Sequence, residues 1–152
     1  MKVKEFANAM DGDHPFKFRS DGVEVRPPVR EQRFALAGAV ENLLLDAGEI
    51  RDGIQPAAAV WMLVLDKDLA VLRLDERTDH EVVVSVEVHS LAEWTPKATF
   101  VRNHRGPEAT ESVVLDPLPG FPNRLEESAD LPRRSLLSFW KALLAAREAA
   151  AR

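Results

Sequence analysis

The chain of 152 residues contains no cysteine. This absence excludes disulfide bridges, thiolate nucleophiles, thioester carriers and cysteine-ligated zinc sites. Long apolar runs are also absent, because the longest, at residues 57–65, is far shorter than the roughly 18–20 residues that span a bilayer. Polar residues follow the first few positions, where a secretory signal would be apolar. We therefore expect a cytoplasmic protein that does not enter a membrane.

Several sequence motifs of catalysis and ligand binding are missing as well. There is no His-Glu-x-x-His, no Gly-x-Ser-x-Gly and no glycine-rich phosphate loop. Asp11 and Asp13 resemble the opening of a calcium loop, but the ligands that should follow them are absent. The net charge of −5 gives no general attraction to nucleic acid or anionic lipid. We therefore expect no cofactor, no metal and no nucleic-acid partner.

The overall composition is that of an ordinary globular domain. Hydrophobic residues make up 45% of the chain and charged residues 30%, close to globular averages. A chain of this length can bury roughly 68–70% of its unfolded surface, enough for one core. We predict a single domain over residues 1–152, in which residues 1–14 carry little pattern and are flexible.

The strongest structural signal lies at residues 57–89, where three apolar segments are separated by short polar gaps. This pattern predicts a three-stranded antiparallel meander. Residues 57–65 are apolar at every position, which is typical of a strand covered on both faces. Residues 81–89 alternate, so that the even-numbered valines share the core face while Glu87 and His89 share the solvated face.

Before the meander, the sequence predicts a hairpin, a helix and a linker. Alternating residues at 16–26 flank Ser20-Asp21-Gly22 and predict a small hairpin. Apolar residues recur at helical spacing over residues 29–47, and Gly48 follows where a helix would end. Residues 49–56, with a glycine and a proline, are interpreted as a linker.

After the meander, residues 90–94 predict one helical turn with Ser90 as its N-cap. Residues 98–102 and 111–115 predict two short strands. Residues 116–132 contain four prolines and form a long loop, which in a compact domain is often functional or disordered. Residues 133–152 carry a leucine and tryptophan stripe at helical spacing and predict a C-terminal helix.

These elements predict an α+β fold, in which a predominantly antiparallel sheet is packed by two amphipathic helices. Small secretion chaperones and several immunity-protein families resemble this order of elements and are likewise small and acidic. Two helices can cover only one sheet face, although residues 57–65 are apolar on both. We therefore expect another protein chain on the second face, in a homo-oligomer or a hetero-complex.

The candidate binding residues lie mainly in the proline-rich loop. Its prolines restrict the backbone, so less entropy is lost when the loop is ordered. Phe121 and Leu125 offer apolar contacts beside Arg124, which together would form a presented binding loop. The alternative is a passive crossover in which Phe121 is a plug against the sheet.

A second set of candidates lies between the two short strands. Arg102, His104 and Arg105 concentrate two guanidinium groups and an imidazole on a turn, which could clamp a phosphate or carboxylate. The alternative is a turn with exposed charges. Trp94, at the predicted sheet edge, is a candidate interface residue because tryptophan is common at binding hot spots.

The absence of catalytic motifs favours a non-catalytic protein-binding module, such as an adaptor, chaperone, immunity factor or small subunit of a complex. The alternative is a small metal-dependent hydrolase or nuclease that uses surface residues. Glu87, His89 and His104 are its candidate groups, because carboxylate and imidazole side chains serve as metal ligands and as acid–base groups.

Overall fold

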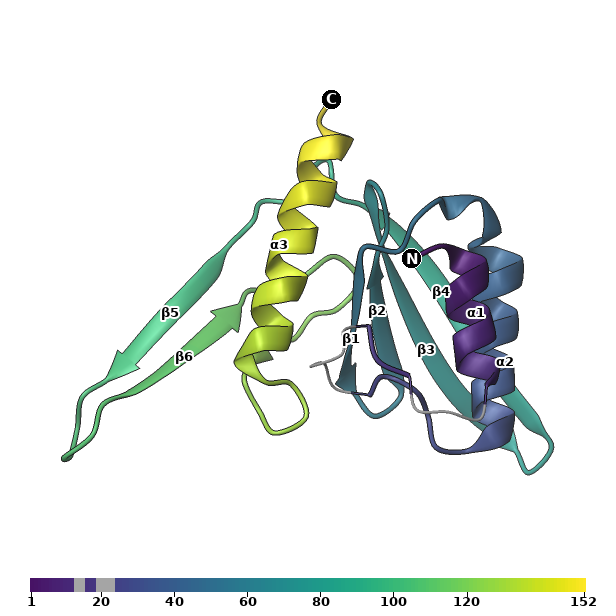
Figure 1. Cartoon of the computed structure of the whole chain (residues 1–152), viewed down its shortest axis with the longest axis horizontal. Coiled ribbons are helices and arrows are strands. Elements are labelled where there is room, and N and C mark those ends of the chain that lie inside the picture. The colour runs from purple at the N-terminus through teal and green to yellow at the C-terminus, as the bar shows by residue number, and fades with distance from the viewer. Residues whose placement is uncertain (13–15, 19–23) are drawn as a thin grey trace.

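A computed structural model describes residues 1–12, 16–18 and 24–152. Figure 1 shows the arrangement of helices and strands in that part of the chain. The helices are α1 (Val3–Asp11), α2 (Arg30–Leu43) and α3 (Arg133–Ala150), with a 3-10 turn, η1 (Leu45–Ala47), after α2. The first sheet contains, in spatial order, β1 (Asp52–Ala57), β2 (Val60–Val64), β3 (Asp68–Thr78) and β4 (Glu81–Ser90). The second contains β5 (Ala98–Asn103), β6 (Thr110–Leu115) and β7 (Leu125–Glu126).

Both sheets are antiparallel, so the predicted α+β class is confirmed. The meander at 57–89 corresponds to β2, β3 and β4, and the two predicted short strands correspond to β5 and β6. The C-terminal helix also forms as expected. The strands are divided between two sheets, however, because β5 and β6 pair with each other and with β7 rather than extending the meander.

The four-stranded sheet is covered on both faces by helices of its own chain (Figure 1). Trp61 and Leu63 of β2 belong to the apolar cluster with α1 and α2, whereas Met62 and Val64 belong to the cluster with α3. The prediction of burial on both sides is thus confirmed for β2, but the strand begins later than predicted, because Ala57 ends β1 and residues 57–59 are exposed. The argument that a second chain must cover one face fails, because the two long helices lie on opposite faces.

Residues 1–14 were expected to be flexible, but Val3–Asp11 form α1. The apolar residues of α1 recur at i, i+3, i+4 and i+7, which is one helix face. These buried residues are Val3, Phe6, Ala7 and Met10. They pack into the same cluster as Leu36 and Val40 of α2, so tertiary packing stabilises a helix that is too short to be stable alone.

The predicted linker at 49–56 is also wrong, because β1 begins at Asp52 and pairs with β2. Glycine and proline normally weaken a strand assignment, but both are tolerated on an edge strand. Gly53 is required by packing: a Cβ there would lie 2.3 Å from Cε2 of Phe18. Gly53, which made this segment resemble a linker in the sequence, is therefore the residue that allows Phe18 to pack onto β1.

Two smaller predictions differ from the structure in detail. The turn of the predicted hairpin at 16–26 lies outside the described residues, and its described flanks form no strand, although Val25 N donates to Phe16 O at 3.4 Å. Residues 90–94 form a hydrogen-bonded turn instead of a helical turn, with Trp94 N donating to Leu91 O at 3.2 Å. No helix within the described ranges is both long and apolar enough to cross a membrane.

The docking of α1 gives a direct test of the fold. Phe6 is 0% exposed, and we expect Phe6→Ala to lower the free energy of unfolding by about 3–5 kcal/mol, as large-to-small core changes do. Asn8→Ala, at an exposed position of the same helix, should change it by less than about 0.5 kcal/mol. Urea denaturation of both variants measures the difference. Equal midpoints would contradict a docked α1.

Candidate binding surfaces

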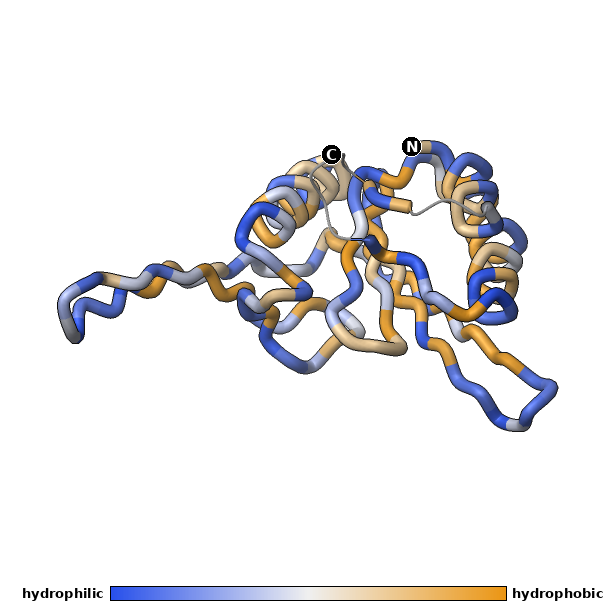
Figure 2. Tube along the Cα trace, turned by 60° about the horizontal axis from the view of Figure 1, so that its bottom comes forward, coloured by the Kyte–Doolittle hydropathy of each residue, from blue (hydrophilic) through white to orange (hydrophobic). Residues whose placement is uncertain are grey.

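The most exposed part of the described chain is the hairpin of β5 and β6, residues 98–115, which we call the arm. It projects away from the four-stranded sheet, on the other side of α3 from α1 and α2 (Figure 1). All six residues of β5 are exposed. They include Phe100 and Val101, whose exposed fractions are 60% and 43%. Figure 2 shows that the arm extends well beyond the packed body.

The base of the arm is anchored under α3. Val113 and Leu115 of β6 are buried in the same apolar cluster as Leu136 and Phe139 of α3. Alternation along the strand places Val113 and Leu115 on one face of β6, toward that cluster. The arm is thus fixed to the body through the end of β6 that carries Val113 and Leu115. No residue of β5 belongs to this apolar cluster.

The two sides of this second sheet differ in whether their outward-facing backbone groups are hydrogen-bonded. On the β6 side, β7 pairs with Val114 and Leu115, and the backbone N–H of Val113 donates to the Glu127 carboxylate. Arg133 donates to the carbonyl of Glu111 and also binds Glu127, with Nε 3.0 Å from Oε1. On the β5 side, no backbone hydrogen bond to any described element other than β6 is formed along the strand. One edge is therefore covered and the other is open.

The proline-rich loop is more ordered than a structureless connection. It contains β7 and an antiparallel bridge between Leu118 and Phe121. Phe121 is only 8% exposed and Leu125 only 2%, and both belong to the cluster under α3. Their side chains therefore support the alternative in which Phe121 is a plug. Arg124 remains exposed and lies 3.4 Å from Glu126.

These loop residues also line a cleft of about 600 Å³, as bounded by the described residues. Phe121, Arg124 and Leu125 form part of its wall, and residues 53–58, from β1 and the turn after it, form another part. The structure thus brings together three of the binding residues predicted from the sequence.

The other predicted binding residues do not converge. Arg102 of β5 binds Glu111 across the strand pair, with Nη1 2.7 Å from Oε2. His104 and Arg105 follow in the connection to β6, where the N–H of Arg105 donates to Asn103 Oδ1. Because one guanidinium is already paired, the turn does not offer the double clamp that the sequence suggested. Trp94 packs edge-on against Trp140, at a centroid distance of 6.0 Å, inside the α3 cluster.

The candidate metal residues form only a pair. Glu87 Oε2 lies 2.9 Å from Arg73 Nη1 and 3.4 Å from His89 Nε2. His104 lies in the arm, which projects on the far side of α3 from β4 (Figure 1). In the described part of the chain, no group of three or more histidine, aspartate and glutamate residues could hold a metal ion.

Arg73 links this pair to the proline-rich loop, because its guanidinium also donates to the carbonyl of Gly120. Gly120 has φ +80°, and a Cβ there would lie 2.3 Å from His89 Nε2. The loop therefore closes directly over the solvated face of β4. This contact docks the proline-rich loop onto the sheet.

The sequence did not identify Phe100 and Val101 as site residues, because an apolar pair in a short strand is expected to be buried. The sequence did predict two short strands separate from the meander, but it did not indicate that one edge of this strand pair is open. Comparison with protein-family models, with curated proteins and with solved structures finds no match. The candidate function therefore rests on the geometry described above.

Arg73 should hold Glu87 in its charged form. Hydrogen bonds from Arg73 and then His89 lower the pKa of Glu87 below its ordinary value of 4.5. Because the folded-state pKa is lowered, the contribution of Glu87 to stability is present above its unfolded pKa and is lost as pH falls through the folded value. We expect NMR titration to show this lowered pKa, and Arg73→Gln to raise it. Arg77→Gln, at the exposed end of β3, is the control.

The docking of the loop can be tested at Gly120. Gly120→Ala places a side chain at positive φ, which costs about 1–2 kcal/mol, and it also displaces His89. Gly106→Ala is a matched control, because Gly106 has φ +88° with open space around it. We expect the free energy of unfolding to fall further in Gly120→Ala, as measured by urea denaturation. Equal losses would argue against close contact between Gly120 and His89.

Proposed function

We propose that this protein is a non-catalytic binding module, located in the cytoplasm, that contacts another protein chain through its arm. The observation that carries this proposal is the open edge of β5. All six residues of that strand are exposed, two of them are large and apolar, and the opposite edge of the sheet is covered.

An open strand edge presents backbone donors and acceptors that a partner strand can satisfy. The two apolar side chains add area that is removed from water on binding, at about 25 cal/mol per Å². Natural proteins usually protect such edges with charge, proline or cover. In this chain Glu127 and Arg133 protect the β6 edge. The difference between the two edges supports a binding role for the unprotected one.

The hydrolase or nuclease alternative has less support from the geometry. Its three candidate residues do not meet, and Glu87 is already bound by Arg73. A metal that displaced Arg73 would have to compete with a charge-assisted hydrogen bond.

Affinity capture from the host, with the tagged full chain as bait, tests the proposal. Phe100→Thr/Val101→Thr removes both exposed apolar side chains and places threonine, a residue that favours strands, at both positions. We expect at least one chain to be recovered with the wild-type protein and to fall at least tenfold with this variant, about 1.4 kcal/mol of binding free energy.

Val88→Thr is the matched control, because Val88 is a valine that is 51% exposed on another strand. Both variants should keep the wild-type unfolding midpoint, since exposed side chains contribute little to stability. Recovery of the same chains in the same amounts with the wild type and the double variant would contradict a binding role for the arm.

A further inference from the structure

The partner that the arm fits best is a second copy of the same chain. We infer that β5 pairs with β5 of another copy, edge to edge and antiparallel, across a two-fold axis. This inference rests on the proposed function and names its partner. It follows from the direction of the β5 backbone groups, the order of its side chains and the charge of the arm.

The direction of the backbone groups is fixed by the pairing with β6. Asp116 N donates to Lys97 O at 3.1 Å, so these opposed residues form a hydrogen-bonded pair. Along antiparallel strands such pairs alternate with pairs that exchange no hydrogen bond. Thr99 and Val101 therefore bond to β6, while the backbone groups of Phe100 and its neighbours at 98 and 102 point to the open edge.

A second observation gives the same alternation. Val113 is directly opposite Phe100, and its N–H points away from β5 to the carboxylate of Glu127. The pair therefore exchanges no hydrogen bond between the two strands. Phe100 accordingly presents both its N–H and its C=O at the centre of the open edge.

This arrangement is self-complementary. A two-fold axis at Phe100 places the residue opposite its own copy, and each hydrogen-bonded pair of this kind exchanges two bonds. The same register places Ala98 opposite Arg102 of the second copy, and this pair also has its backbone groups at the edge. All outward-facing groups of β5 between these residues would then be satisfied.

The side chains fit the same register. In this register one apolar row runs across four strands, in the order Val113 and Phe100 of one copy, then Phe100 and Val113 of the other. Opposed aromatic residues on neighbouring strands stabilise a sheet by roughly 0.2–1 kcal/mol per pair. Arg102 arrives beside Ala98 already bound to Glu111, so no unpaired charge is brought to the interface.

The charge distribution favours approach through the arm. Residues 98–115 contain two arginines and two glutamates, and so they are neutral, whereas the whole chain carries −5. Two bodies of the same negative charge repel, but two neutral arms that project from them do not. A strand pair of this length buries less area than a standard interface, so we expect a dissociation constant on the order of micromolar.

Sedimentation equilibrium on the full chain, from about 1 µM to 1 mM, tests this association. We expect the mass to rise from 16.9 kDa toward twice that value. Phe100→Pro should keep the protein monomeric across this range, because proline removes the central outward N–H without removing a bond to β6. Phe100→Thr keeps that N–H and should dimerise more weakly than the wild type but more strongly than Phe100→Pro. Val88→Thr is the control and should dimerise as the wild type does.

The register can be tested by disulfide formation, because the chain has no cysteine of its own. The proposed axis places Thr99 opposite Val101 of the second copy, in a pair with a Cα distance of about 4.5 Å, which a disulfide can bridge. A mixture of Thr99→Cys and Val101→Cys should therefore give a mixed disulfide. A mixture of Thr99→Cys and Val88→Cys should not.

The outcomes separate this inference from the proposed function. A chain that stays monomeric at 1 mM, or a dimer that Phe100→Pro leaves intact and that forms no 99–101 disulfide, would overturn the self-pairing. If the chain is monomeric but host capture still depends on Phe100 and Val101, the arm binds a different protein and only the self-pairing fails. If the dimer forms as described and no other host chain depends on the arm, the second copy is its partner.

Discussion

The rest of the structure depends on the need to cover both faces of β2. Trp61 and Leu63 face one way and Met62 and Val64 face the other, and each of these side chains is buried. At about 25 cal/mol per Å² of apolar area, neither face can be left in water without a large loss of stability. One chain of this length satisfies both faces only by placing helices on opposite sides of the sheet.

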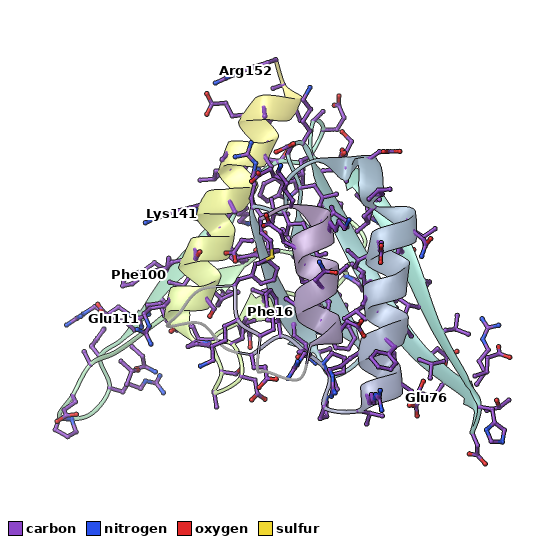
Figure 3. All side chains as sticks on the ribbon, turned by 45° about the vertical axis from the view of Figure 1, so that its right-hand side comes forward. Phe16, Glu76, Phe100, Glu111, Lys141 and Arg152 are labelled. Carbon is purple, nitrogen blue, oxygen red and sulfur yellow. The ribbon has the colours of Figure 1, made fainter. Side chains whose placement is uncertain are left out.

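That requirement determines where the chain travels after β4. To bring α3 onto the second face, residues 91–132 must cross from one end of the sheet to the other. The crossing is held by Arg73, which binds both Glu87 and the carbonyl of Gly120. The arm projects away from this crossing (Figure 1), and of its two strands only β6 contributes residues to the apolar cluster under α3. Figure 3 shows the result, with Phe100 and Glu111 on the side of α3 opposite to α1 and α2.

The sequence predicted those elements whose pattern is set by local burial. Residues 133–152 repeat at helical spacing because one face of α3 is buried along its length. Residues 81–89 form a strand as predicted, but Val88, which was expected on the core face, is 51% exposed, and no residue of the edge strand β4 is fully buried. β1 was missed because the glycine that accommodates Phe18 is also a common loop residue. α1 was missed for a different reason, since Phe6 and Met10 have the right spacing in a segment too short for periodicity alone to decide.

The candidate site could not be predicted in the same way, because it depends on what is absent beside a strand. Phe100 and Val101 are of residue types that are common in buried strands. Their exposure follows only from the path of α3 and the proline-rich loop. Conversely, Phe121 is an aromatic residue in a polar loop, which suggested a surface contact, but its neighbours fold it into the core. In the structure the proline-rich loop docks against the sheet, through the Arg73 contact to the carbonyl of Gly120 and the burial of Phe121.

The two edges of the second sheet are treated differently: the β6 edge is covered and the β5 edge is open. An apolar, β-branched edge is a hazard for aggregation, and proteins normally place charge or proline on it. Here the protection is placed on the β6 side, through Glu127 and Arg133, where it also fixes the arm to α3. On the β5 side, Arg102 is neutralised by Glu111 rather than left to repel an incoming strand. Arg102 is the one charged residue of β5, and its pairing with Glu111 leaves no free charge on the strand, in keeping with the pairing proposed above.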